Sequence, residues 1–147
     1  MAPLIALIIG TGLGRLLGLL GLDTFDTWPA ALRIGLALMF LLTGIAHFGL
    51  GRRDGLIAMV PPRLPRPDLL VTITGILELV GAAGLLLPAT YRAAAVCLAL
   101  LLVVMFPANI YAARAHVLVA GKPETPIPQR TALQLVFLAA ALIVALA

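Results

Sequence analysis

The sequence predicts an all-α fold, a polytopic transmembrane helical bundle that forms a single domain over residues 1–147. Of these residues, 63% are hydrophobic and only 11% are charged, whereas an ordinary soluble domain carries about 25% charged residues. The apolar residues also form runs of about 20, the helix length that crosses the hydrocarbon core of a bilayer. This composition argues against a cytosolic globular enzyme, and the single Cys97 excludes a disulfide within one chain.

Five apolar segments account for the predicted spans. The first has no basic n-region and no small-residue cleavage site, so we interpret it as a retained helix rather than a signal peptide. The last is the shortest and lies at the lower limit for crossing a bilayer. In chain order, the predicted spans are residues 2–22, 30–50, 69–87, 91–113 and 131–147.

The distribution of basic residues predicts the orientation of these spans. The loops over residues 51–68 and 114–130 contain seven of the ten Lys and Arg residues, whereas the opposite side has only Arg33 and Arg92 and an acidic loop. The positive-inside rule then places the basic loops and the N-terminus in the cytoplasm and the C-terminus outside the cytoplasmic (inner) membrane. The basic residues do not alternate with aromatic ones, so nucleic acid is not an expected partner.

Small residues predict where the helices pack closely. Gly10, Gly14 and Gly18 recur every four residues on the first span, a pattern that lets another helix approach. The third span has a second set on one face: Thr74, Gly75, Glu78, Gly81 and Ala82. Lipid would stabilise neither glycines nor a carboxylate, so we expect this face to point inward, with structural roles for Gly75 and Gly81.

Glu78 is the outstanding candidate for a functional residue. It lies about 13 Å into the third span, where a carboxylate is costly and therefore indicates a proton carrier, a substrate ligand or a general base. The alternative is a structural role, with Glu78 hydrogen-bonded across helices or paired with Arg15. Arg15 in turn either descends toward Glu78 or extends to the outer interface, and the shorter path favours the interface.

Three further residues predict a pocket that opens to the cytoplasm. His47, near the end of the second span, has a side chain that exchanges protons near neutral pH, although a lone histidine there is more often interfacial. Pro107 frees a backbone carbonyl inside the fourth span, and Asn109 either satisfies that carbonyl or faces a ligand. We expect His47 and Asn109 at the mouth, the proline-rich segment 56–67 as a lid, and Glu78 about 9 Å deeper.

Short motifs distributed over most of the chain resemble those of a known family. They are Arg33-Ile34-Gly35, Gly44-Ile45-Ala46-His47-Phe48, Met59-Val60-Pro61, Leu64-Pro65, Thr74-Gly75-Ile76-Leu77-Glu78, Gly84-Leu85-Leu86 and Phe106-Pro107-Ala108-Asn109. As a set they resemble the DoxX family of small bacterial integral membrane proteins. The resemblance implies a four-helix core over residues 30–147, preceded by an additional helix and loop over residues 1–29. It also implies that His47, Glu78, Pro107 and Asn109 are shared positions.

The resemblance suggests a function as well. Some members of the wider family are associated with quinone-linked sulfur oxidation or with membrane redox complexes. This implies a quinone as a non-covalently bound cofactor and a soluble or membrane redox protein as partner. We therefore expect a quinone- or lipid-binding subunit in which Glu78 and His47 handle protons as catalytic residues, while Asn109, Thr74 and Arg15 bind the ligand.

The alternative is a non-catalytic membrane anchor or assembly factor for a cytoplasmic partner, and a homo-oligomer is compatible with both functions. The sequence contains no self-contained catalytic motif, so any enzymatic role would be that of a subunit in a redox complex. Its His, Cys and carboxylate residues also lack the spacing of metal ligands, and no metal is expected.

Overall fold

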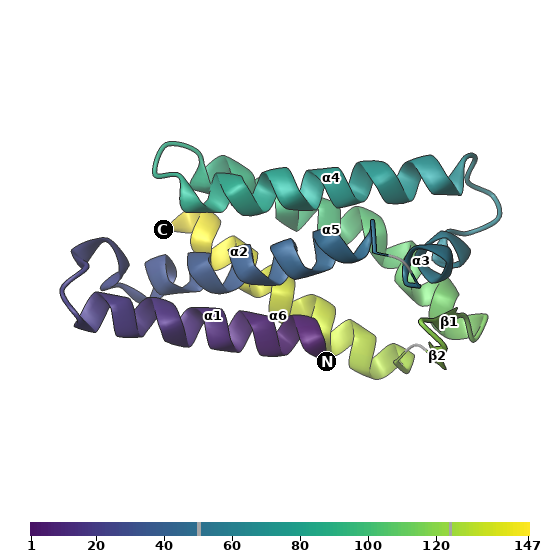
Figure 1. Cartoon of the computed structure of the whole chain (residues 1–147), viewed down its shortest axis with the longest axis horizontal. Helices are drawn as coiled ribbons and strands as arrows, with labels where there is room; N and C mark the ends of the chain where they lie inside the picture. Colours follow the sequence, from purple (N-terminus) through teal and green to yellow (C-terminus); the bar gives the residue numbers. More distant parts are fainter. Residues whose placement is uncertain (50, 124) are drawn as a thin grey trace.

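The chain folds into a bundle of long helices that run roughly along one direction (Figure 1). The computed structural model describes residues 1–49, 51–123 and 125–147. Five helices are long and apolar enough to cross a membrane, which confirms the predicted all-α transmembrane bundle. They are α1 (Ala2–Leu19), α2 (Trp28–Ala46), α4 (Pro67–Leu86), α5 (Tyr91–Arg114) and α6 (Ile127–Leu146).

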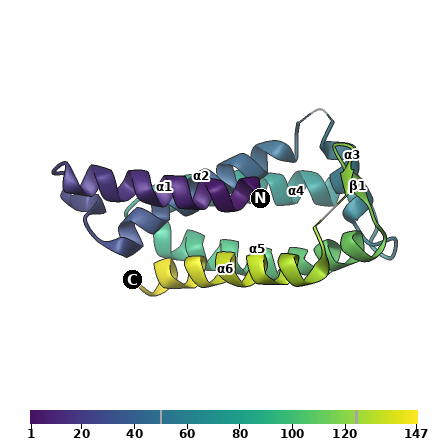
Figure 2. The same ribbon diagram turned by 90° about the horizontal axis from the view of Figure 1, so that it is seen from below.

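The long helices form two layers, which are seen from below in Figure 2. The helices α1, α2 and α4 lie side by side in one layer, and α5 and α6 pack together in the other. The helix α2 is central because it contacts α1, α4 and α6, and half of its span is buried, more than in any other helix. The outward side chains are largely Leu, Ile and Val, a surface suited to lipid.

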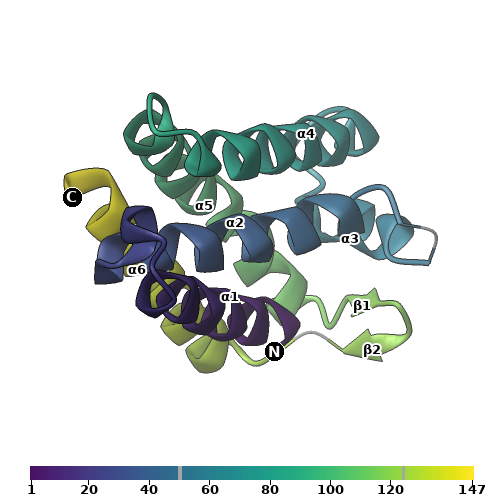
Figure 3. The same ribbon diagram turned by 60° about the vertical axis from the view of Figure 1, so that its left-hand side comes forward.

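Four short elements join the long helices: η1 (Asp23–Phe25), α3 (Arg53–Met59), β1 (Leu118–Val119) and β2 (Lys122–Pro123). The helix α3 and the antiparallel β1–β2 hairpin lie at the same end of the bundle (Figure 3). They pack closely because Gly55 has no side chain: a Cβ there would lie 2.7 Å from the Cα of Val119. The hairpin was not predicted, and the segment 56–67, expected to be too rich in proline for a continuous helix, begins inside α3.

Three helices begin earlier than predicted, and their N-terminal signals explain why. The helix α4 starts at Pro67 instead of residue 69, with the proline in its first turn. The helix α2 starts at Trp28 because the Thr27 hydroxyl accepts a hydrogen bond from the Ala30 backbone N–H over 3.3 Å, as an N-cap does. The helix α6 starts at Ile127 with Pro128 in its first turn, a position that proline favours. The C-terminal span is therefore 20 residues long instead of the 17 that hydropathy alone suggested.

Two helices, α1 and α2, end more than one residue earlier than predicted. The helix α1 ends at Leu19 rather than at residue 22, just before Gly21, whose φ of 98° breaks the helical path. The helix α2 ends at Ala46 rather than at residue 50, and residue 50 itself lies outside the described residues. The early end of α2 affects the position of His47, which lies in the wall of a cavity.

The glycine stripe of α1 packs directly on α2, as its spacing predicts. A Cβ on Gly10 would lie 2.7 Å from the Cα of Gly35, and a Cβ on Gly14 would lie 2.8 Å from the Cα of Ala31. Gly18 approaches the backbone of Phe25 in the same way. Close approach lets dispersion contacts hold the two helices together in lipid, where the hydrophobic effect contributes little to helix association.

This contact gives a first testable prediction. The substitution Gly10→Ala is expected to destabilise the protein by about 1–3 kcal/mol, because the new methyl group meets backbone atoms that have no rotamer to adopt. Gly12→Ala is the matched control, since a Cβ at Gly12 meets nothing within 4 Å. Thermal unfolding of both variants in detergent measures the difference, and equal midpoints would contradict the close packing of α1 on α2.

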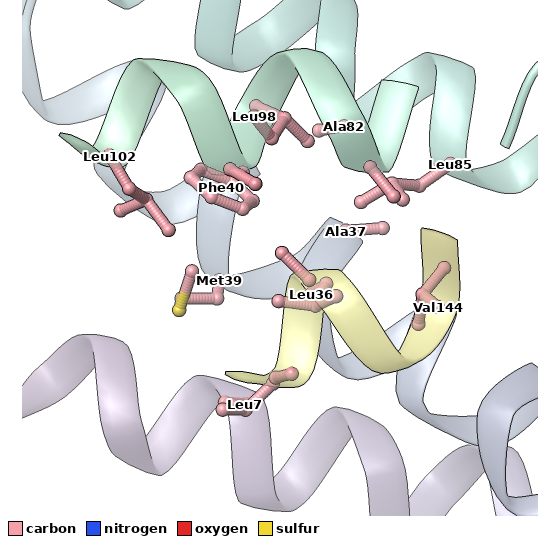
Figure 4. Close-up of a cluster of buried hydrophobic side chains, with 14 of the residues drawn as sticks. Leu7, Leu36, Ala37, Met39, Phe40, Ala82, Leu85, Leu98, Leu102 and Val144 are labelled. Atoms are coloured by element: carbon pink, nitrogen blue, oxygen red, sulfur yellow. The ribbon is translucent and has the colours of Figure 1, made fainter. Parts of the chain in front are cut away.

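The core lies between the two layers, around α2 (Figure 4). Its largest fully buried side chains come from four helices, with three of them from α2: Leu36, Met39, Phe40, Leu85, Leu98 and Val144. On α4, Gly75, Glu78, Gly81 and Ala82 are all buried, which confirms that this face points inward. The core therefore continues directly into the surroundings of Glu78.

Candidate functional site

A cavity of about 610 Å³ lies at the end of the bundle that carries α3 and the hairpin. Side chains from all five long helices line it, and α1 contributes its first residues. Residues of α3, of the segment after α3 and of the hairpin complete the lining. Most of the lining is apolar, including Met39, Phe40, Met105 and Phe137, as is typical of sites for small amphiphilic ligands. Leu56, Met59, Val60 and Leu64 of the proline-rich segment line it too, consistent with the predicted lid.

The cavity brings together four of the residues predicted from sequence. His47, Thr74, Glu78 and Asn109 all line it. Glu78 is the one carboxylate among the described residues of the lining, which also includes the cationic Arg52, Lys122 and Arg130.

Glycines on α2 and α4 allow His47 and Glu78 to meet. A Cβ on Gly75 would lie 2.6 Å from the Cβ of His47, so only glycine permits this approach. On the opposite helix, a Cβ on Gly44 would lie 2.8 Å from Leu79 and 3.3 Å from the Cβ of Glu78. Gly75 therefore has a structural role at this contact between α2 and α4. Gly81 has one as well, because a Cβ there would lie 2.5 Å from the side chain of Leu98 on α5.

His47 and Glu78 are neighbours, and the predicted separation of about 9 Å in depth is wrong. The His47 Nδ1 lies 3.7 Å from the Glu78 Oε2, and the two residues are only 8% and 2% exposed. The helix α4 extends past the end of α2 (Figure 1), so the middle of α4 lies level with the residue that follows α2. The sequence estimate assumed instead that both helices begin and end at the same depth.

The hydrogen bonds of His47 fix the orientation of its ring. The Nδ1 lies 2.9 Å from the Thr43 carbonyl oxygen, and because a carbonyl only accepts, Nδ1 carries the hydrogen. Burial lowers the pKa of His47, an effect that the hydrogen bond to Thr43 opposes and the charge of Arg53 reinforces. The imidazole is therefore neutral at pH 7, with Nε2 free of a proton and able to accept one.

Glu78 has a buried oxygen, Oε2, without a hydrogen-bond partner among the described residues. An unpaired buried carboxyl oxygen is costly, and in native structures it calls for an explanation such as a function or a bound molecule. Glu78 itself is one of the residues that line the cavity.

A second polar group lies on the α5 and α6 side of the cavity. The Arg130 Nη1 donates a hydrogen bond of 2.6 Å to the Asn109 Oδ1, and the Gln134 Nε2 donates one of 2.7 Å to the Leu102 carbonyl. Asn109 therefore pairs across helices, and it is Gln134 that satisfies a carbonyl near the Pro107 turn. The helix α5 continues through Pro107 without interruption.

Arg15 lies elsewhere and does not join Glu78. Its guanidinium donates to the Asp26 carbonyl, lies 3.4 Å from the Asp26 carboxylate and stacks over the ring of Trp28 at 5.1 Å. The sequence allowed Arg15 either to descend toward Glu78 or to extend to the outer interface, and these contacts correspond to the second orientation. Arg15 does not line the cavity. Its expected role as a ligand-binding residue beside Glu78 is not supported by this geometry.

Sequence reasoning missed three polar residues inside the bundle: Arg33, Arg130 and Gln134. The two arginines were assigned to a helix end and a loop because the spans were located by hydropathy. Two sequence signals would have corrected these assignments: the N-cap residue Thr27, which marks an earlier start of α2, and Pro128, which marks an earlier start of α6. With those starts, Arg33 lies deeper in a helix that already contained it, and Arg130 lies in a helix instead of a loop. Both side chains make hydrogen bonds to other helices.

These features define a class: a polytopic helical membrane protein in which a buried imidazole and carboxylate face an apolar cavity. Its described residues contain no group of three or more His, Cys, Asp or Glu side chains that could hold a metal ion. The chain belongs to the family described as "Domain of unknown function (DUF8561)", which it matches over residues 36–145. The match begins inside α2, so α1 lies outside it. No curated protein and no solved structure matches the chain.

Proposed function

We propose that this protein binds a quinone-class amphiphile from the bilayer and exchanges protons with its head group through Glu78 and His47. The observation that carries the proposal is the pair of buried side chains, 3.7 Å apart, in the wall of a largely apolar cavity of about 610 Å³. The resemblance to the DoxX family adds support, because some of its members are associated with quinone chemistry.

The residues fit the chemistry of such a head group. A quinol hydroxyl donates a hydrogen bond, and we assign its acceptor to the carboxylate of Glu78, which lines the cavity and has an oxygen without a partner among the described residues. The unprotonated Nε2 of His47 is a second acceptor, able to take a proton as general base. Arg130 and Asn109, held to each other at 2.6 Å, offer polar contacts from the α5 and α6 side, while the apolar lining accommodates the tail.

The proposal assigns binding and proton exchange to this chain and the transfer of electrons to a separate redox protein. We further propose a cytoplasmic membrane location in a bacterium, with the cavity at the cytoplasmic side. The support is the position of the basic residues, since Arg52, Lys122 and Arg130 all lie at the cavity end of the bundle. A proton released from Glu78 or His47 would then leave through the mouth of the cavity on that side.

Binding of a short-tailed benzoquinone in its reduced quinol form, which has the hydroxyl donors that the proposal requires, tests the proposal. The purified protein is expected to bind it saturably, and Glu78→Gln is expected to weaken binding at least tenfold, because the amide loses the charged acceptor. Asp68→Asn is the matched control: it makes the same change on the same helix, but Asp68 does not line the cavity. The measurements are equilibrium titration with the quinone and the folded yield of each variant.

The results of this titration distinguish a quinone-binding protein from a non-catalytic membrane anchor. Loss of binding in Glu78→Gln with a normal folded yield supports the proposal, and unchanged binding in that variant overturns it. No quinone binding by the unmodified protein, together with capture of a soluble partner at the basic end, would favour an anchor or assembly factor instead.

A further inference from the structure

A second cavity lies at the opposite end of the bundle, and we propose that it binds the phosphate group of a membrane lipid through Arg33. The cavity has a volume of about 370 Å³, and its lining includes Thr24, Thr27, Arg33 and Tyr91. It is formed where the α1–α2 connection, the start of α5 and the end of α6 come together (Figure 1). This site is independent of the Glu78 cavity and of the function proposed for it.

Arg33 carries a buried charge that no acidic side chain neutralises. It is 8% exposed, and in the described part of the chain no carboxylate lies within ion-pair distance of it. Its Nε donates to the Leu85 carbonyl at 3.0 Å and its Nη2 to the Leu86 carbonyl at 3.5 Å. These carbonyls belong to the last turn of α4, where helices leave acceptors unused, so Arg33 caps α4.

Capping α4 uses only part of the guanidinium. The group has five N–H donors in a planar fork, and the described residues provide no acceptor for those on Nη1. The ring of Tyr91, whose centroid lies 4.2 Å from the guanidinium carbon, covers one face and holds the plane in position. The remaining donors are thus pre-organised for an anion, and a guanidinium fork matches the oxygen geometry of phosphate.

The charges around the cavity favour an anion as well. The charged side chains at this end of the bundle are Arg15, Arg33 and Arg92 with Asp23 and Asp26, and of these only Arg33 lines the cavity. Asp26 is already paired with Arg15, and Asp23 is exposed on η1. Arg92 donates to the Tyr91 hydroxyl and to the Ala147 carbonyl, which leaves its charge beside the cavity.

Aromatic residues identify a lipid as the source of the phosphate. Trp28, which is 69% exposed, and Tyr91 are the first residues of α2 and α5 and lie at this same end. Tryptophan and tyrosine concentrate at the level of the lipid head groups. The cavity is therefore at the depth of lipid phosphates, and the hydroxyls of Thr24 and Thr27 add donors for the phosphate oxygens.

Thermal unfolding in a neutral detergent with three additives tests the proposal. Phosphatidylglycerol is expected to raise the unfolding midpoint of the unmodified protein by several degrees, because a ligand that binds only the folded state stabilises it. Diacylglycerol, which lacks the phosphate, and inorganic phosphate, which lacks the lipid, are expected to produce no rise. This comparison needs no variant and therefore does not depend on the folding of one.

Two substitutions then locate the effect. Arg33→Gln is expected to abolish the rise with phosphatidylglycerol, and Arg63→Gln, a change to an exposed arginine at the opposite end of the bundle, is expected to retain it. Where Arg33→Gln folds poorly, Arg33→Lys keeps the charge but loses the fork, and should show a smaller rise. The site would be overturned if diacylglycerol raised the unfolding midpoint as much as phosphatidylglycerol does, or if both Arg33 variants kept the full rise. If inorganic phosphate alone raised the midpoint, a lipid would be overturned as the source of the phosphate.

Discussion

Replacing Gly75 with leucine is expected to separate α2 from α4 and to disrupt the cavity end of the bundle. A Cβ at this position would lie 2.6 Å from the Cβ of His47 and 2.9 Å from the ring of Phe48. Leucine adds three more carbon atoms in the same direction, and overpacking of this kind costs about 3 kcal/mol. Because the contact also holds His47 beside Glu78, any variant protein that folds should bind the quinone probe weakly.

The control for this prediction is the same substitution at Gly12. That glycine lies on α1, and a Cβ there would meet nothing within 4 Å, so Gly12→Leu should add an apolar side chain to the lipid-facing surface and leave the midpoint unchanged. Thermal unfolding of the two variants, with quinone titration of whatever remains folded, gives the comparison. A Gly75→Leu protein as stable as Gly12→Leu would show that α2 and α4 do not approach each other closely at Gly75.

Truncation of Leu36 is the second change with a large expected effect. Leu36, on α2, is completely buried, and Leu36→Ala leaves a void that its neighbours fill only in part. In a membrane the transfer of the side chain out of water contributes little, so the loss comes from packing. We expect about 2 kcal/mol, the low end of the range for buried leucines.

Leu41 provides the comparison on the same helix. It is 44% exposed and faces outward, so lipid fills the space that Leu41→Ala opens, and the change should be within about 0.5 kcal/mol. Unfolding by a denaturing detergent, followed by circular dichroism, measures both variants. Similar losses at the two positions would mean that α2 is not the central helix.

The sequence predicted the spans and the inward face of α4 because both follow from local patterns. A run of apolar residues needs only its own length to identify a span. Glu78 could be oriented because Gly75, Gly81 and Ala82 share its face by helical spacing, and that spacing does not depend on neighbouring helices. His47, Glu78 and Asn109 were assigned to one pocket by a different route, from their depths along antiparallel spans.

The relations between helices were harder to predict. The contact of His47 with Glu78 depends on how far α4 extends past the end of α2. The connection between α2 and α4 sets this offset, and it contains α3, a helix too short to appear in a hydropathy pattern. The pairing of Arg130 with Asn109 depends on where α6 begins. Proline and threonine at the helix starts decide that position, and hydropathy does not register them.

The Glu78 cavity takes part of its wall from every long helix, from the first turn of α1 to the middle of α6. It therefore exists only after the last helix has joined the others, and partly assembled bundles have no such site. Any molecule that occupies it stabilises the finished bundle over those intermediates by mass action. The lifetime of the protein against membrane proteases should accordingly rise when a molecule occupies the cavity.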